Sequence, residues 1–212
     1  MARAPAPAKS SRWERRPDER PQELLEAALV VFARKGYRGT RLEEVAEAAG
    51  VTKGTIYHYF DTKENLLLGV IQHYQSIAFG RVEDVLHDRA MPSAARIRLL
   101  VERLFQRSPD KGAPLLAVLI RMIAHEVPAV HARWLREGPV RVWTLIAEMV
   151  EEGKSRGEFR AGADGEAAAR TLVSGLMVQL MWQQHADDVP ELRIDEQRLI
   201  AASVDVFLTG LA

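Results

Sequence analysis

The strongest constraint in this chain is the spacing of its apolar residues, which recur every three or four positions in almost every segment. This period places side chains on one face of an α-helix, whereas a half-buried strand needs strict alternation. Between residues 18 and 35, one such stripe is formed by Leu24, Leu25, Ala28, Val31 and Phe32. No segment alternates over a useful length and no internal repeat is visible. The sequence therefore predicts an all-α protein.

Glycine, proline and capping residues divide this pattern into about nine to ten helices. Gly36 is expected to end the first helix, because glycine readily adopts the left-handed conformation of a helix stop. Thr40 and Glu43 have the spacing of a capping box, which would start a second helix at Thr40. Thr52 is expected to cap a third helix.

A fourth helix is predicted from Lys63 towards residue 87, capped by Thr62 or Asp61. Further helices are predicted at about 93–107, 113–125, 128–137, 139–156, 164–185 and 191–210. The predicted architecture is an N-terminal three-helix bundle with a helix-turn-helix, joined to a larger C-terminal helical bundle.

Three regions follow from this organisation. Residues 1–17 are rich in proline, alanine and basic residues and are expected to be disordered, either as a solubilising tail or as a basic arm that reaches DNA phosphates. Residues 18–65 would form the helix-turn-helix domain and residues 66–212 the larger bundle.

Composition argues against a disulfide-bonded, membrane or secreted protein. A length of 212 residues with 47% hydrophobic content can bury a sizeable core, and the absence of cysteine excludes disulfides and thiolate chemistry. No apolar run approaches the ~20 residues of a membrane helix, and the N-terminus lacks the apolar middle of a secretion signal. A soluble, cytoplasmic protein without membrane contact is expected. The net charge is zero, but residues 1–63 carry 12 basic against 9 acidic side chains, so nucleic acid stays open as a partner.

Residues 42–60 have the pattern of a helix-turn-helix. Two short helices that cross steeply need a small residue at the crossing, here Ala46, and the tight turn needs a residue free to take positive φ, here Gly50. Ile56 would anchor the second helix on the first. The remaining inward positions of this helix pair include Val51 and Phe60.

With that face turned inward, the polar residues of the second helix point outward. The N-terminal residues of a helix in the major groove meet base edges. The short or flexible residues at this end are Thr52, Lys53, Gly54 and Thr55. Tyr57, His58 and Tyr59 could pack on sugars and donate to phosphates. Thr40, Arg41 and Lys63 would bind the flanking backbone. The alternative is that this segment only packs within a helical bundle.

The stretch "GYRGTRLEEVAEAAGVTKGTIYHYFDTKENLL" (36–67) resembles the DNA-binding domain of the tetracycline-repressor (TetR) family throughout. The resemblance implies that Lys53, Gly54, Thr55 and Tyr57 face bases, and that phosphates are held mostly by Thr40, Thr52, His58, Tyr59 and Lys63. Arg41 departs from the Thr or Ser that is frequent in the family. A ligand-responsive transcriptional regulator is implied, most simply a repressor that binds a palindromic operator as a homodimer and is released by a small, largely apolar effector.

The C-terminal region would then hold the effector and form the dimer. The dimer interface is predicted from one face of helix 164–185 and from the last helix, as Thr171, Gly175, Val178, Trp182, Leu199, Val204 and Phe207. Both stripes could instead be internal core. Candidate residues of the effector pocket are Met122, His125, Trp134, Trp143 and Met149, although Met and Trp at helical spacing are often core.

Catalytic and metal chemistry find little support. His125 and His131 are six residues apart, which misses one helical face, so no metal site is predicted. "GKSRGEFR" contains Gly-Lys-Ser but lacks the upstream glycine of a phosphate loop. We expect no cofactor and no enzymatic activity. Two alternatives remain open, a helical scaffold or ligand-binding protein and an α-helical enzyme.

Overall fold

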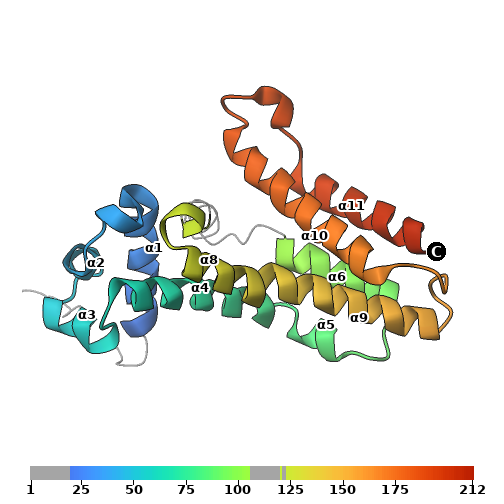
Figure 1. Ribbon diagram of the computed structural model, residues 1–212, viewed down its shortest axis with the longest axis horizontal. Helices are drawn as coiled ribbons and strands as arrows, with labels where there is room; N and C mark the ends of the chain where they lie inside the picture. Colours follow the sequence, from blue (N-terminus) through green and yellow to red (C-terminus); the bar gives the residue numbers. More distant parts are fainter. Residues whose placement is uncertain (1–19, 106–119, 121–122) are drawn as a thin grey trace, which may run out of the picture.

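Helical periodicity in the sequence is matched by helices throughout the part of the chain that the structure describes. The computed structural model describes residues 20–105, 120 and 123–212, and these residues form ten α-helices and no strand (Figure 1). The predicted all-α class is confirmed. The predicted tail, 1–17, lies outside the described residues.

The first three helices form a head at one end of the elongated molecule (Figure 1). They are α1 (Arg20–Gly39), α2 (Leu42–Ala48) and α3 (Lys53–Tyr59). All five residues of the predicted α1 stripe are buried. Gly36 interrupts α1 with a φ of 77°, which is the left-handed geometry expected where the first helix stops.

Two helices connect the head to the rest of the molecule, α4 (Lys63–Gly80) and α5 (Glu83–His87). Thr62 caps α4 by accepting a hydrogen bond from the backbone N–H of Asn65 at 3.1 Å. The sequence predicts one helix to residue 87, and this is wrong. The chain leaves the helix at Arg81, and the break turns Val82 and Val85 into the C-terminal core, where both are fully buried.

The larger bundle starts with α6 (Ser93–Phe105), α8 (Pro128–Leu135) and α9 (Arg141–Ser155). A break between α8 and α9 is predicted at Gly138-Pro139, but the two helices join through a π-helical turn, Arg136–Val140. Pro139 has no N–H for the helical ladder, and the wider turn carries the chain past it. The predicted helix at 113–125 lies mostly outside the described residues.

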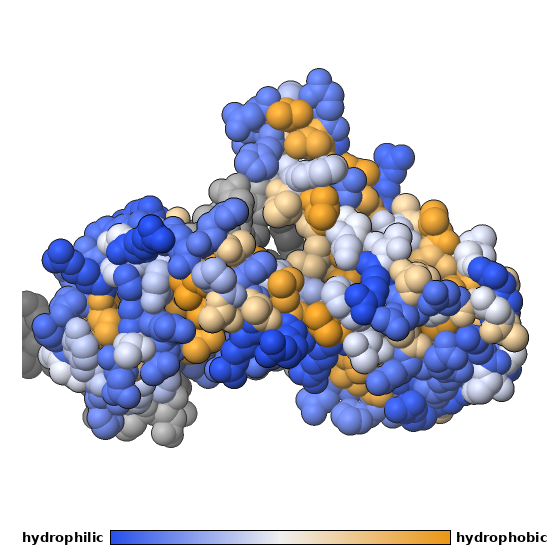
Figure 2. Space-filling view, viewed as in Figure 1, coloured by the Kyte–Doolittle hydropathy of each residue, from blue (hydrophilic) through white to orange (hydrophobic). Residues whose placement is uncertain are grey.

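The last two helices are α10 (Gly165–Trp182), capped by Asp164, and α11 (Glu196–Leu211), capped by Asp195. Between them lie two short 3-10 turns, Gln183–His185 and Pro190–Leu192. The end of α10 and these turns project from the body (Figure 1), and hydrophobic residues reach the surface of the projection (Figure 2).

The buried residues form two clusters. The first fills the head and α4, and it is completed by four residues from the middle of the sequence: Ile123, Val127, Val130 and Trp134. The second lies among α5, α6, α9, α10 and α11. Helix α4 continues without a break across the predicted domain boundary at 65/66, and its buried residues belong to the first cluster. A shift of this helix would therefore displace the residues of the head that pack against it.

Candidate nucleic-acid interface

The turn between α2 and α3 is a glycine-dependent helix stop. Gly50 has a φ of 67°, its N–H donates to the Glu47 carbonyl at 3.0 Å, and the Val51 N–H donates to the Ala46 carbonyl at 2.9 Å. These two bonds define a Schellman motif, which satisfies the last carbonyls of α2. No atom lies within 4 Å of where a Cβ at Gly50 would stand, so the backbone conformation and not space makes glycine the favourable residue.

One apolar residue of α3 pins it against α2. Ile56 is fully buried, and Ala46 of α2, the small residue predicted at the helix crossing, is buried in the same cluster. Val51 and Phe60 are half-buried and pack against that cluster. The opposite face of α3 is therefore turned to solvent.

Four of the predicted recognition residues are exposed on this face: Lys53, Gly54, Tyr57 and His58. Thr52, also exposed, caps α3, because its Oγ1 accepts from the Thr55 N–H at 3.2 Å, and the two hydroxyls share a hydrogen bond of 2.9 Å. Thr55 is half-buried. Tyr59 is half-buried as well and packs on the first cluster, with its ring edge-on to His58.

A carboxylate on α2 holds two of the recognition residues. Glu43 Oε1 lies 2.7 Å from Lys53 Nζ and accepts a hydrogen bond from the Tyr57 hydroxyl at 3.2 Å. Lys53 Nζ also lies 5.5 Å from the centroid of the Tyr57 ring. The hydrogen bond from Lys53 is the main cause that lowers the pKa of Glu43 to about 2, so the carboxylate is ionised at any physiological pH.

The predicted capping box of α2 is wrong. Thr40 is buried, and its hydroxyl donates to the Gly36 carbonyl at 2.7 Å. Helix α2 starts after Arg41, whose N–H donates to Glu44 Oε2 at 3.0 Å, so Glu44 rather than Glu43 closes the helix start. Since the Thr40 side chain is enclosed and already bonded, the prediction that it holds a phosphate is corrected. Arg41 is exposed.

Lys63 also differs from its predicted role. Its Nζ donates to the carbonyls of Tyr37 at 2.7 Å, Thr40 at 2.9 Å and Arg38 at 3.4 Å, and it lies 4.4 Å from the Tyr37 ring centroid. An ammonium has three protons, and three carbonyls use them. Lys63 therefore ties α4 to the connection between α1 and α2, and the prediction that it binds DNA phosphate is corrected.

The predicted effector-pocket residues that the structure describes are divided between the two clusters and the surface. Trp134 is buried in the first cluster and stacks with His131, whereas Met149 is buried in the second. Trp143 is half-buried beneath the guanidinium of Arg170, and His125 is exposed. Met122 lies outside the described residues. The four predicted residues that the structure describes therefore belong to two different clusters or to the surface.

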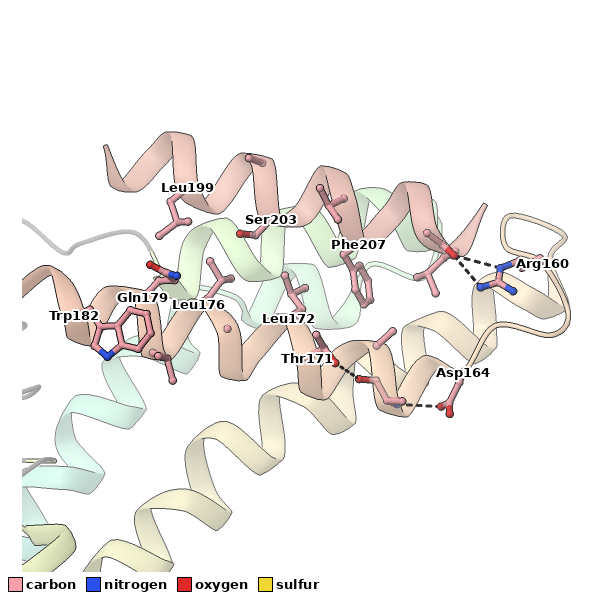
Figure 3. Close-up of a pocket in the computed structure, with 18 residues that line it drawn as sticks. Arg160, Asp164, Thr171, Leu172, Leu176, Gln179, Trp182, Leu199, Ser203 and Phe207 are labelled. Carbon is pink, nitrogen blue, oxygen red and sulfur yellow. Dashed lines mark hydrogen bonds between the residues drawn. The ribbon is translucent and has the colours of Figure 1, made fainter. Parts of the chain in front are cut away.

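A surface groove of about 800 Å³ lies between α10 and α11 (Figure 3). Six of the predicted dimer-interface residues line it: Thr171, Gly175, Val178, Trp182, Leu199 and Phe207. Val204 does not line the groove. Its side chain is fully buried in the second cluster, so its assignment to an interface is corrected. Val206, which was not predicted, lines the groove and is 75% exposed.

Comparisons with known proteins identify the family. Residues 24–70 match the family described as bacterial regulatory proteins, tetR family, and residues 111–210 match the AefR-like transcriptional repressor, C-terminal domain. The chain belongs to the TetR family, as its sequence motif predicts.

Several characterised proteins are similar to this chain over most of its length. It is 27% identical over 190 residues to the HTH-type transcriptional repressor KstR2 of Rhodococcus jostii (strain RHA1), with 90% of each chain covered. FadR from Bacillus subtilis in complex with stearoyl-CoA has a TM-score of 0.70 at 22% identity, over 90% of this chain and 99% of that chain. AibR in complex with isovaleryl coenzyme A and operator DNA has a TM-score of 0.65 at 19% identity, over 89% and 97%. The two structural likenesses establish the fold.

Two kinds of feature are absent from the described residues. None of their helices is both long and apolar enough to cross a membrane. Nor do these residues contain a group of three or more His, Asp or Glu side chains placed to hold a metal ion.

Proposed function

We propose that the protein is a ligand-responsive transcriptional repressor that binds a palindromic operator as a homodimer and is released by a small effector. The observation that carries the proposal is the solvent face of α3, which presents Lys53, Gly54 and Tyr57 outward while Ile56 pins the helix from below. Membership of the TetR family supports it. The protein acts in the cytoplasm and is not an enzyme.

The N-terminal residues of α3 read base edges in the major groove. Thr52, Lys53, Gly54 and Tyr57 are the base-reading group, with Thr55 beneath them. His58 and Arg41, both exposed, bind the backbone, with a smaller part for the half-buried Tyr59. Residues 18–65 form the DNA-binding unit and residues 66–212 the effector and dimer unit.

The dimer forms through α10 and α11 of each chain. The groove between these helices, together with exposed Val178, Trp182 and Val206, is an apolar surface that a second copy would cover (Figure 3). Two such chains related by a twofold axis would place their α3 helices about 34–36 Å apart, as successive major grooves require.

The effector is an acyl thioester of coenzyme A, with a largely apolar acyl chain. This class is supported by the ligands named for the structural relatives FadR and AibR. We place the effector's site of action where α4 meets α8. There the Gln75 side chain donates to the Trp134 carbonyl at 3.3 Å beside the π-helical turn. A ligand that displaces this contact would move α4.

Movement would reach the head by two routes. Helix α4 carries Lys63, which holds the carbonyls between α1 and α2. Glu126 accepts a hydrogen bond from the Arg38 N–H at 2.9 Å, which joins the C-terminal region to the end of α1. An effector that binds better to the conformation with mismatched recognition helices shifts the population away from DNA.

Footprinting on the DNA that flanks the protein's own gene tests this function. We expect protection of an inverted repeat, and loss of protection on adding stearoyl-CoA or isovaleryl-CoA but not the free acids. A scaffold protein would show no preference over random DNA, and that result would refute the proposal. Release by a free fatty acid would refute only the thioester assignment.

A further inference from the structure

Glu43 stands out because it is acidic and lies among residues that would face DNA. It occupies the first turn of α2, yet its carboxylate turns to α3 and contacts both Lys53 and Tyr57 through the same oxygen. A carboxylate near phosphates is repelled by them, so it weakens binding unless it has another use.

We propose that Glu43 is a specificity-determining residue, which holds Lys53 and Tyr57 for base contacts and suppresses their use on phosphates. The inference rests on the proposed function. It deepens that function, because it concerns how the recognition helix distinguishes an operator from other DNA.

Lys53 can contact a base while its ammonium remains paired with the Glu43 carboxylate. An ammonium has three donors, and Glu43 takes one of them. The other two can reach the O6 and N7 acceptors of a guanine, which form the usual bidentate contact of a basic side chain in the major groove. The Lys53 side chain is 68% exposed, so these donors are accessible. The Tyr57 hydroxyl, bonded to the same oxygen, keeps the aromatic ring beside the ammonium.

The same arrangement disfavours phosphate. Sequence-independent binding depends on the number of cations that neutralise phosphates. Each lysine between residues 20 and 63 has a partner. Lys35 pairs with Glu44 at 2.7 Å, Lys53 with Glu43 at 2.7 Å, and Lys63 with three carbonyls. Lys53 is the one of these three that lies on the recognition helix. A phosphate that approached it would also approach the Glu43 charge, whereas neutral base acceptors would not be repelled.

Glu43→Gln tests this role, because glutamine keeps an acceptor for Lys53 and Tyr57 but removes the charge. Binding of the full-length protein to operator and to random duplex DNA is measured by fluorescence anisotropy between 50 and 200 mM salt. We expect random DNA to bind on the order of threefold tighter, with a salt slope steeper by about 0.9, the value of one added phosphate contact. Operator affinity should rise less, so the ratio of the two affinities falls.

Glu44→Gln is the matched control. It removes the same charge one residue away, but from a carboxylate that pairs with Lys35 and the Arg41 N–H instead of with the recognition helix. We expect Glu44→Gln to leave the operator-to-random ratio unchanged. Circular dichroism checks that both variants keep their helices.

Three results would overturn the inference. The ratio could be unchanged in Glu43→Gln, it could change equally in Glu44→Gln, or both DNAs could lose affinity in parallel. If the wild-type protein itself prefers no DNA sequence, the proposed function fails together with the role of Glu43. A wild type with an operator preference that Glu43→Gln retains would refute the role of Glu43 alone.

Discussion

Replacing Lys63 with methionine separates a structural role from a DNA-binding role. Methionine keeps much of the apolar stem but removes the ammonium that bonds the carbonyls of Tyr37 and Thr40 at 2.7 and 2.9 Å, with a longer contact to Arg38 at 3.4 Å. A hydrogen bond to a charged group contributes about 1.5–3 kcal/mol, and less where water reaches it. Two good bonds on a half-buried side chain therefore predict a loss of about 2–3 kcal/mol in the free energy of unfolding.

Urea unfolding measures this loss. The protein concentration is kept fixed, because the stability of the proposed dimer would depend on it. Lys53→Met is the stability control. Its ammonium is exposed and makes a surface ion pair, so we expect a change within about 0.5 kcal/mol. The same Lys53 variant should lower the affinity for operator more than the affinity for random DNA.

The salt dependence of DNA binding completes the test. Because the Lys63 protons are already used by carbonyls, Lys63→Met should leave the salt slope unchanged at temperatures where the protein is folded. Arg41→Met removes an exposed cation from the start of α2 and should lower the slope by about 0.9. An unchanged stability of Lys63→Met together with a slope lowered by about 0.9 would show that Lys63 binds phosphate, and the structural argument would be refuted.

Three further changes have defined outcomes. Ile56→Ala leaves a cavity where a fully buried side chain packs under α3, so the free energy of unfolding in urea should fall by about 2–5 kcal/mol. Operator binding should be lost as well. A fall of less than about 1 kcal/mol would contradict the role of Ile56 as anchor. Val206→Asp should produce monomers in sedimentation without unfolding, because Val206 is exposed; a persistent dimer would place the interface elsewhere. The hydrogen bond from Arg96 lowers the pKa of Glu152, so this pair stabilises the fold above the ordinary carboxyl pKa of 4.5 and loses its effect as pH falls. Arg96→Met should flatten that acid dependence of stability, and an unaltered dependence would assign it to other groups.

Local signals in the sequence were sufficient for most of the helices and for the turn between α2 and α3. Apolar period, capping threonines and Gly50 act over a few residues, and the structure has a helix stop at Gly50 and caps at Thr52 and Thr62. The buried face of α3 followed from the same period, because Ile56 is its apolar residue at the centre of the segment.

Contacts between distant residues could not be predicted in this way. Lys63 donates to carbonyls 23 to 26 residues earlier in the chain, and the Tyr57 hydroxyl donates to Glu43 across 14 residues. Contacts over such separations produce no periodic pattern of residue types in the sequence. The phase of α11 was also ambiguous, because Val204 and Val206 are both apolar and only packing decides which one turns inward. A proline at position 139 predicted a helix end, whereas tertiary packing favoured a wider turn.

The way the head is closed has a consequence for how such regulators can diversify. Ile123, Val127, Val130 and Trp134 complete the hydrophobic core of the first cluster, whose other buried members all precede residue 72. Transplanting the first 70 or so residues onto a relative would leave this core mismatched, with exposed apolar surface on one partner and a poorly filled cavity on the other. We therefore expect new DNA preferences to arise with less loss of stability through substitutions on the exposed face of α3 than through exchange of the whole N-terminal region.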